Sequence, residues 1–206
     1  MYQNGGYQVI NLRKGSCVQN QDQLSEGYQL DGLQVIANIG ADKIVDLLHR
    51  FIYMYDEPMF FILELHTNQQ NETESPQGQI QSFHNDVYYI DGCSKEDALM
   101  ILDRVGELLI NDGLCSFGFG CHYTKDEVMI EKYNVVRINS SDVQKFSTFF
   151  EQLQVPQVEH LITAWNTFTQ DQPGESFSVK MNGKDAYDIP EILSDMGIYF
   201  AERRAQ

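Results

Sequence analysis

The clearest features of the chain are two stretches in which apolar residues recur every three or four positions, the spacing of one helix face. The first runs from Ala41 to about Tyr55. The second begins at Ser94, a short polar residue suited to capping the first turn, and Asp97 follows three residues later, as in a capping box. Its apolar face stops at Asp112-Gly113. We therefore predict a helix in each stretch.

Strands are predicted before, between and after these helices. Met59 to Leu65 is an almost continuous apolar run, which is typical of a buried strand. Val87 to Ile90 predicts a second strand and Cys115 to Gly120 a third, so that strands flank the second helix. Residues 126–139 have the pattern of a hairpin, with Val135 to Ile138 as its second arm.

The two ends of the chain carry weaker patterns. The first 35 residues are rich in Gln, Asn and Gly, and the alternation in residues 7–12 predicts one or two short edge strands there. Beyond residue 140 we predict a helix capped by Ser141 and running through Phe150, and another from Pro156 to about Phe168. Asn182-Gly183 predicts the tight turn of a hairpin over residues 177–189. A short helix from Pro190 and an apolar stretch at 198–200 complete the chain.

These elements predict an α+β fold: a single compact domain, residues 1–206, with a mixed or antiparallel sheet and several packed helices. Residues 67–79 hold no large apolar side chain and include Pro76 and Gly78, so we expect a surface loop there. A loop over 67–83 divides the chain into possible subregions 1–66 and 84–206.

Composition narrows the class of protein. Hydrophobic residues make up 42% of the 206 residues and aromatic residues 12%, which excludes a wholly disordered chain. No apolar run approaches the roughly 18–20 residues needed to span a bilayer, and the first residues lack the pattern of a secretory signal. We therefore expect a cytoplasmic protein that does not bind a membrane.

The charge balance points to a kind of partner. Fourteen Lys and Arg stand against thirty Asp and Glu, which gives a formal net charge of −16. A field of this sign repels nucleic acid and anionic membranes, but it attracts a basic protein and speeds its association. Acidity that serves only solubility is the simpler explanation of the same composition.

The cysteines and histidines are the candidate metal ligands and nucleophiles of the chain. Cys115, Cys121 and His122 are close in sequence, but no Cys-x2-Cys pair exists, and a straight strand would hold the two thiols about 20 Å apart. We expect free thiols in a cytosolic protein, with no metal and no cofactor. Cys93 precedes a helix N-terminus, where a thiol pKa is lowered, yet no histidine forms a recognisable signature with it.

Two further motifs are interpreted as structural. Gly118-Phe119-Gly120 lacks the lysine and further glycine of a phosphate-binding loop, so its glycines are expected to admit a neighbouring backbone or a large ring. Trp165 is placed on the apolar face of the helix predicted over 156–168, and we expect it in the core.

Several segments in the later part of the chain resemble a known family. They are Val87 to Ser94, Leu108 to Leu114, Phe117 to Gly120, Lys132 to Val136, Leu161 to Trp165, Pro173 to Ser176, and Gly197 to Glu202. They are similar to immunity proteins of bacterial polymorphic-toxin and contact-dependent growth inhibition systems. The first 80 residues carry none of the resemblance.

The resemblance implies a non-enzymatic protein that binds and neutralises a cognate toxin domain. If the toxin is a nuclease, an acidic inhibitor could occupy its basic cleft. Acidic residues at predicted strand ends and turns are the candidate interface: Asp86, Asp91, Asp112, Asp126, Glu127 and Glu131. Ordinary solvated turn residues are the alternative interpretation of these six. A small hydrolase or thiol enzyme centred on Cys93, and an adaptor for another protein, are the alternative functions.

Overall fold

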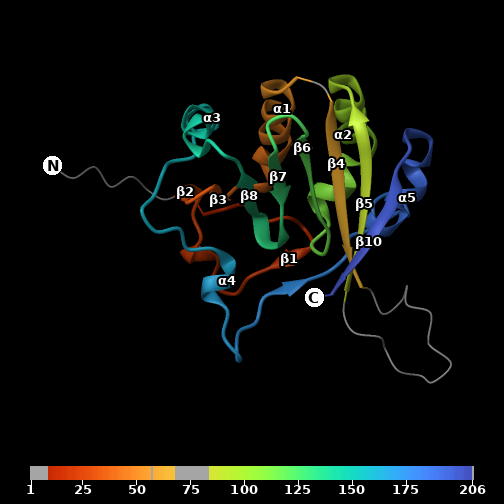
Figure 1. Cartoon of the computed structure of the whole chain (residues 1–206). Helices are drawn as coiled ribbons and strands as arrows, with labels where there is room; N and C mark the ends of the chain where they lie inside the picture. The colour runs from red at the N-terminus through yellow and green to blue at the C-terminus, as the bar shows by residue number, and fades with distance from the viewer. Residues whose placement is uncertain (1–8, 57, 68–83, 206) are drawn as a thin grey trace.

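An eight-stranded antiparallel sheet forms the centre of the molecule in the computed structural model, which describes residues 9–56, 58–67 and 84–205 (Figure 1). The strand order is β10-β5-β4-β6-β7-β8-β3-β2. The strands are β2 (Gly27–Asp31), β3 (Gln34–Asn38), β4 (Met59–His66), β5 (His84–Cys93), β6 (Ser116–Cys121), β7 (Asp126–Ile130), β8 (Val135–Asn139) and β10 (Tyr199–Ala205). Elements from both predicted subregions share this sheet, and the α+β class is confirmed.

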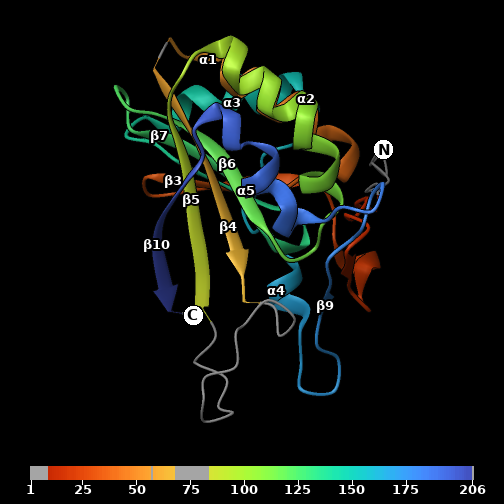
Figure 2. The same ribbon diagram turned by 90° about the vertical axis from the view of Figure 1, so that its right-hand side faces the viewer.

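Helices cover one face of the sheet (Figure 2). α1 (Ile44–Met54) and α2 (Lys95–Asn111) lie side by side across the central strands, and α5 (Ile189–Ile192) packs against α2. α3 (Phe146–Gln152) adds Phe146 and Phe150 to the same core, where Phe150 stacks on Tyr28 of β2. One continuous apolar core therefore lies between the sheet and its helices.

The predicted start of α2 is confirmed in detail. The Asp97 backbone N–H donates to Ser94 Oγ at 3.1 Å, and the Ser94 N–H donates to Asp97 Oδ2 at 3.0 Å. These two bonds satisfy amide groups that have no partner within the first helical turn. The same Asp97 carboxylate accepts from the Ser94 hydroxyl, and these hydrogen bonds lower its pKa.

Strand alternation gives the sheet two different faces. In β4, Met59, Phe61 and Leu63 are fully buried under the helices, whereas Glu64 points to the opposite face. β6 alternates in the same way, with Phe117 and Phe119 under the helices and glycines opposite. We call the side away from α1 and α2 the open face.

The two glycines of β6 have the role predicted for them. A Cβ at Gly118 would lie 1.8 Å from the carbonyl oxygen of Val128, which is backbone of the adjacent strand β7. A Cβ at Gly120 would lie 2.1 Å from the ring of Phe60. Gly118 therefore admits a neighbouring backbone, and Gly120 admits a large ring.

The helix predicted from Pro156 to Phe168 is wrong for most of its length. Only Ala164–Thr167, α4, is helical. Residues 156–158 instead pair with β2: the Tyr28 N–H donates to the Pro156 carbonyl, and the Val158 N–H donates to the Tyr28 carbonyl, each at 2.9 Å. The edge strand thus gains partners that the apolar pattern of 156–168 does not reveal.

Other predicted helices and strands also differ from the observed elements in where they begin and end. The helix expected from Ser141 begins as a 3-10 turn at Val143–Lys145 and continues as α3. Asn182-Gly183 does form a tight turn, with φ of 52° and 81°, but only the flanking residues 181 and 184 pair, because the chain then enters the turn before α5. Near the N-terminus, β1 (Ser16–Cys17) pairs with β9 (Glu175–Ser176) rather than joining the main sheet. Most of the predicted loop 67–83 lies outside the described residues.

Candidate functional site

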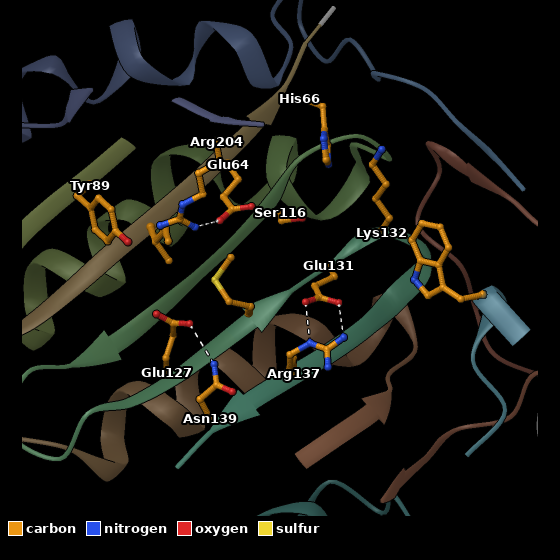
Figure 3. A pocket seen from close by; sticks show the side chains of 13 residues that line it. Glu64, His66, Tyr89, Ser116, Glu127, Glu131, Lys132, Arg137, Asn139 and Arg204 are labelled. Carbon is orange, nitrogen blue, oxygen red and sulfur yellow. Dashed lines mark hydrogen bonds and ion pairs between the residues drawn. The ribbon is translucent and has the colours of Figure 1, made fainter. Parts of the chain in front are cut away.

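The open face contains a hollow with a cavity volume of about 510 Å³ (Figure 3). The centre of the open face is recessed because β6 contributes only small residues to this side, namely Ser116, Gly118 and Gly120. Longer side chains stand around it from the neighbouring strands and from α4. The residues that line the hollow are Ile62, Glu64, His66, Tyr89, Ser116, Glu127, Met129, Glu131, Lys132, Arg137, Asn139, Trp165 and Arg204.

An ion pair from the last strand borders one side of the hollow. Arg204 of β10 donates to Glu64 Oε1 at 2.6 Å and to Glu202 Oε1 at 2.7 Å. The Arg204 side chain remains 42% exposed while that of Glu64 is 17% exposed. The pair therefore joins β10 to β4 across β5 and still presents an arginine to solvent. On the β7 side, the Asn139 amide donates to Glu127 Oε1 at 3.4 Å.

A second ion pair faces the first. Arg137 of β8 donates from Nε to Glu131 Oε1 at 2.9 Å and from Nη2 to Glu131 Oε2 at 3.3 Å, the two-point geometry that fixes both groups. Arg137 also donates to Gln34 of β3. The hydrogen bonds that Arg137 donates to Glu131 raise the pKa of Arg137, so the arginine stays charged.

The turn between β7 and β8 contributes Glu131 and Lys132 to the lining of the hollow. Tyr133 and Asn134 have φ of 58° and 63°, the left-handed region that side-chain-bearing residues seldom adopt in succession. The buried Asn134 amide holds the turn by donating to the carbonyls of Asn11 and Ile39. Arg13, also buried, donates from its backbone to Asn134 Oδ1 at 2.9 Å and from its guanidinium to the Glu131 carbonyl at 3.0 Å.

Trp165 stands at the rim and not in the core, which corrects the sequence-based prediction. Its side chain is 52% exposed. It lies edge-to-face on Tyr133, at 5.0 Å between ring centroids, and on Phe168, at 5.5 Å. The prediction failed because it depended on a helix over 156–168, whereas Trp165 belongs to a single turn, α4, outside the main core.

The hollow is balanced in charge although the whole protein is acidic. Its three carboxylates, Glu64, Glu127 and Glu131, match its three cations, Lys132, Arg137 and Arg204. Partial burial lowers the pKa of His66 to about 4, with Lys132 acting in the same direction, so this imidazole is neutral at physiological pH. Burial also lowers the pKa of Lys132, again reinforced by a neighbouring cation, Arg13. Burial raises the pKa of Glu127.

Three of the six candidate interface acids lie on the open face. Glu127 and Glu131 line the hollow. Asp91 lies opposite Phe60 on the same face, where it accepts a hydrogen bond from the Tyr199 hydroxyl and pairs with His122 at 3.2 Å. Asp91 is therefore beside the hollow and remains exposed.

The other three acids do not join this group. Asp86 lies on the helix side of β5, where Arg203 binds it with two hydrogen bonds of 2.7 and 3.1 Å. Asp112 is fully buried and accepts from the backbone N–H groups of residues 114, 115 and 179. Asp126 is fully buried and pairs with Lys145 at 2.6 Å. Asp112 and Asp126 are structural because each accepts from internal donors and neither has exposed surface.

The cysteines lie away from the hollow or within the core. All four belong to the described part of the chain and none is in a disulfide. Cys93 is buried among the core residues under α2, and burial raises its pKa to about 11, opposite to the lowering expected at a helix N-terminus. Cys115 is buried and its thiol contacts the Leu109 carbonyl. Within residues 9–56, 58–67 and 84–205, no three His, Cys, Asp or Glu side chains are grouped to hold a metal ion.

No family model, curated protein or solved structure matches this chain. Among the described residues, none of the helices is both long and apolar enough to cross a membrane. The fold and the hollow of the open face are therefore the observations on which a function rests.

Proposed function

We propose that this protein is an immunity protein, which binds a cognate toxin domain stoichiometrically and neutralises it, and that the open face of the sheet is its docking surface. The observation that carries the proposal is the hollow, where ion-paired arginines and a half-exposed tryptophan surround a floor that includes Ile62, Met129 and Ser116, on the face without helices. The family resemblance of residues 84–202 supplies the identity of the partner, and it includes the Lys132 and Trp165 segments that border this hollow.

The side chains around the hollow are of the kind that dominate protein interfaces. Trp, Tyr and Arg carry most of the binding energy in such surfaces, and Trp165, Tyr89, Arg137 and Arg204 supply them here. Each arginine is already held by a carboxylate, and Trp165 is held by two aromatic rings. Little side-chain freedom remains to be lost on binding, which favours affinity.

The hollow and the rest of the surface have different roles in recognition because they differ in net charge. The hollow has equal numbers of acidic and basic groups, so the excess negative charge of the protein lies outside it. That excess attracts a basic toxin domain over a distance and speeds association. The paired groups in the hollow then select a partner whose charges alternate in a matching pattern.

The alternative centred on Cys93 has less support. Its thiol is buried on the helix side, and its raised pKa keeps it protonated at physiological pH. We expect Cys93→Ser to protect cells as well as the natural protein does. Loss of protection by folded Cys93→Ser protein would restore the thiol-enzyme hypothesis. An adaptor with another partner would use the same open face, and only the identity of the partner separates it from an immunity protein.

Coexpression with the toxin domain of the adjacent reading frame tests the proposal. Cells should survive, and the two chains should elute as a one-to-one complex in size-exclusion chromatography. Death of cells that contain abundant folded protein would refute the immunity function.

Adjacent arginines of β10 provide a matched pair of variants for locating the surface. Arg204 points to the open face, and Arg203 points to the helix side, while each is paired with a carboxylate. Arg204→Glu should weaken the complex by about tenfold or more, and Arg203→Glu should change it little. If complex formation survives Arg204→Glu but not Arg203→Glu, the docking surface lies on the other side of β10.

A further inference from the structure

One cation in the hollow differs from the others. Arg137 and Arg204 are each bound by a glutamate, whereas Lys132 has no carboxylate within ion-pair distance among the described residues. Its side chain is partly buried and extends toward His66 (Figure 3), and Trp165 also lines the hollow. An ammonium group withdrawn from water without a counter-charge is costly, so this end of the hollow favours an incoming anion.

The surrounding charges reinforce this preference. Besides burial, the charge of the fully buried Arg13 lowers the pKa of Lys132, whereas the buried Asp112 acts in the opposite direction. The Asp112 oxygens are already bound by three backbone N–H groups. Glu131 is neutralised by Arg137. A local positive charge therefore remains in a protein whose net charge is −16.

The backbone next to Lys132 has an unusual conformation. Lys132 directly precedes Tyr133 and Asn134, both in the left-handed region, and such conformations persist only where the surroundings enforce them. Asn134 and Arg13 enforce this turn through buried hydrogen bonds. The turn directs Lys132 into the hollow (Figure 3) and places the Tyr133 ring in edge-to-face contact with Trp165. A strained turn thus fixes both the cation and the aromatic rim.

Neutral groups complete the surroundings of the ammonium. Ser116 is the one hydroxyl-bearing residue that β6 contributes to this part of the face, and it can donate to an oxyanion. His66 is uncharged at physiological pH and can donate or accept through its ring. The exposed indole of Trp165 offers a flat apolar surface beside them. One cation, neutral donors and a flat ring together suit a single oxyanionic group attached to a small carbon skeleton.

We propose that Lys132, Ser116, His66 and Trp165 form a binding site for a small ligand that carries one carboxylate or phosphate group. The oxyanion accepts hydrogen bonds from the Lys132 ammonium and the Ser116 hydroxyl, and the remainder of the ligand lies against Trp165. This inference goes beyond the proposed function, because a free anion can occupy the site whether or not a toxin domain docks on the open face.

Trp165 is the only tryptophan of the chain, and its fluorescence reports directly on this site. The protein is titrated with sodium phosphate and, separately, with sodium acetate, at an ionic strength held constant with sodium chloride. A saturable change in indole emission is expected with at least one of the two oxyanions. The stronger of the two responses identifies phosphate or carboxylate as the preferred group. Isothermal titration calorimetry of the same pairs detects binding that leaves the emission unchanged.

Lys132→Met should weaken the oxyanion by about tenfold or more, since it removes a charged hydrogen-bond donor. Lys180→Met, at an exposed lysine outside the hollow, is the matched control and should bind as the natural protein does. Lys132→Arg should retain part of the affinity, and circular dichroism verifies that each variant is folded. The proposal is overturned if neither anion gives a saturable response by either method, or if Lys132→Met binds as tightly as the natural protein.

Discussion

The two faces of the sheet are built from the same strands but have different chemistry. Under α1 and α2, Phe61, Phe117 and Phe119 exclude water completely. Directly opposite them, Glu64, Glu127 and Arg137 remain partly exposed and hold one another or their neighbours through ion pairs and hydrogen bonds. The covered face contributes most of the stability through apolar burial, whereas the open face maintains an ordered polar surface at little cost in stability. Substitutions on the covered face should therefore lower stability strongly, whereas substitutions on the open face should lower it little.

The largest loss of stability is expected at the covered face. Phe119 of β6 is fully buried and its ring lies 5.3 Å from that of Phe61. Phe119→Ala removes this packing and leaves a cavity, and it should lower the free energy of unfolding by about 3–5 kcal/mol. Urea denaturation followed by circular dichroism measures the change. A loss below about 1 kcal/mol would mean that the covered face does not determine stability.

The next prediction compares two glycines of the same strand. In Gly118→Ala the new methyl group meets the backbone carbonyl of Val128, so strand pairing between β6 and β7 must shift, at a cost of about 3 kcal/mol. In Gly120→Ala it meets the Phe60 ring, which can rotate outward, and the cost should be about 1 kcal/mol or less. Thermal unfolding of both variants gives the comparison. Equal losses would show that the Phe60 ring is held as firmly as the β7 backbone.

Asp126 is a fully buried charged residue on the covered side, and its contribution to stability depends on pH. Burial acts to raise the pKa of Asp126, but hydrogen bonds led by that from Lys145 outweigh it, and the net pKa is lowered. Its contribution to stability is therefore present above the unfolded pKa of about 3.9 and is lost as pH falls through the lower folded value. Asp126→Asn should cost about 2 kcal/mol at neutral pH, because it leaves Lys145 without its carboxylate.

Chemical denaturation at a series of pH values checks this dependence. The difference between the natural protein and Asp126→Asn should shrink as pH falls below about 4. Asp195→Asn is the control, since Asp195 has a lowered pKa through Arg104 but lies at the surface. A difference that stays constant through the acid range would mean that the Lys145 pair does not stabilise the fold.

Much of the covered face could be predicted from the sequence, because burial leaves a periodic pattern. The faces of α1 and α2, the strand β4 and the capping box of Ser94 and Asp97 all follow from local spacing. The extended segment after Pro156 could not be predicted in this way. Its structure depends on the unpaired edge of β2, more than a hundred residues earlier in the chain, and local apolar spacing contains no information about that edge.

The hollow could be predicted only in part for the same reason. The sequence predicts Glu127 and Glu131 as interface candidates because they are acids at predicted strand ends. Arg137 and Arg204 become candidates only in the folded protein, where the register of β8 and β10 brings them to the same face. Asp112 and Asp126 have the same local sequence character as Asp91. Their internal donors, the N–H of residue 179 and the ammonium of Lys145, come from distant segments, and only the folded chain distinguishes buried acids from exposed ones.

The smallest loss of stability is expected on the open face, at the pair of Glu131 and Arg137. Both side chains are about one-third exposed, at 29% and 35% respectively, so solvent screens their attraction. Glu131→Gln and Arg137→Met should each cost less than about 1 kcal/mol, with a coupling of about 0.5–1 kcal/mol in a double-mutant cycle by urea denaturation. Both variants should nevertheless weaken the toxin complex, because the pair positions a surface and does not hold up the core. A coupling of several kcal/mol would show instead that this pair supports the fold. The two faces would then not differ in their contribution to stability as argued above.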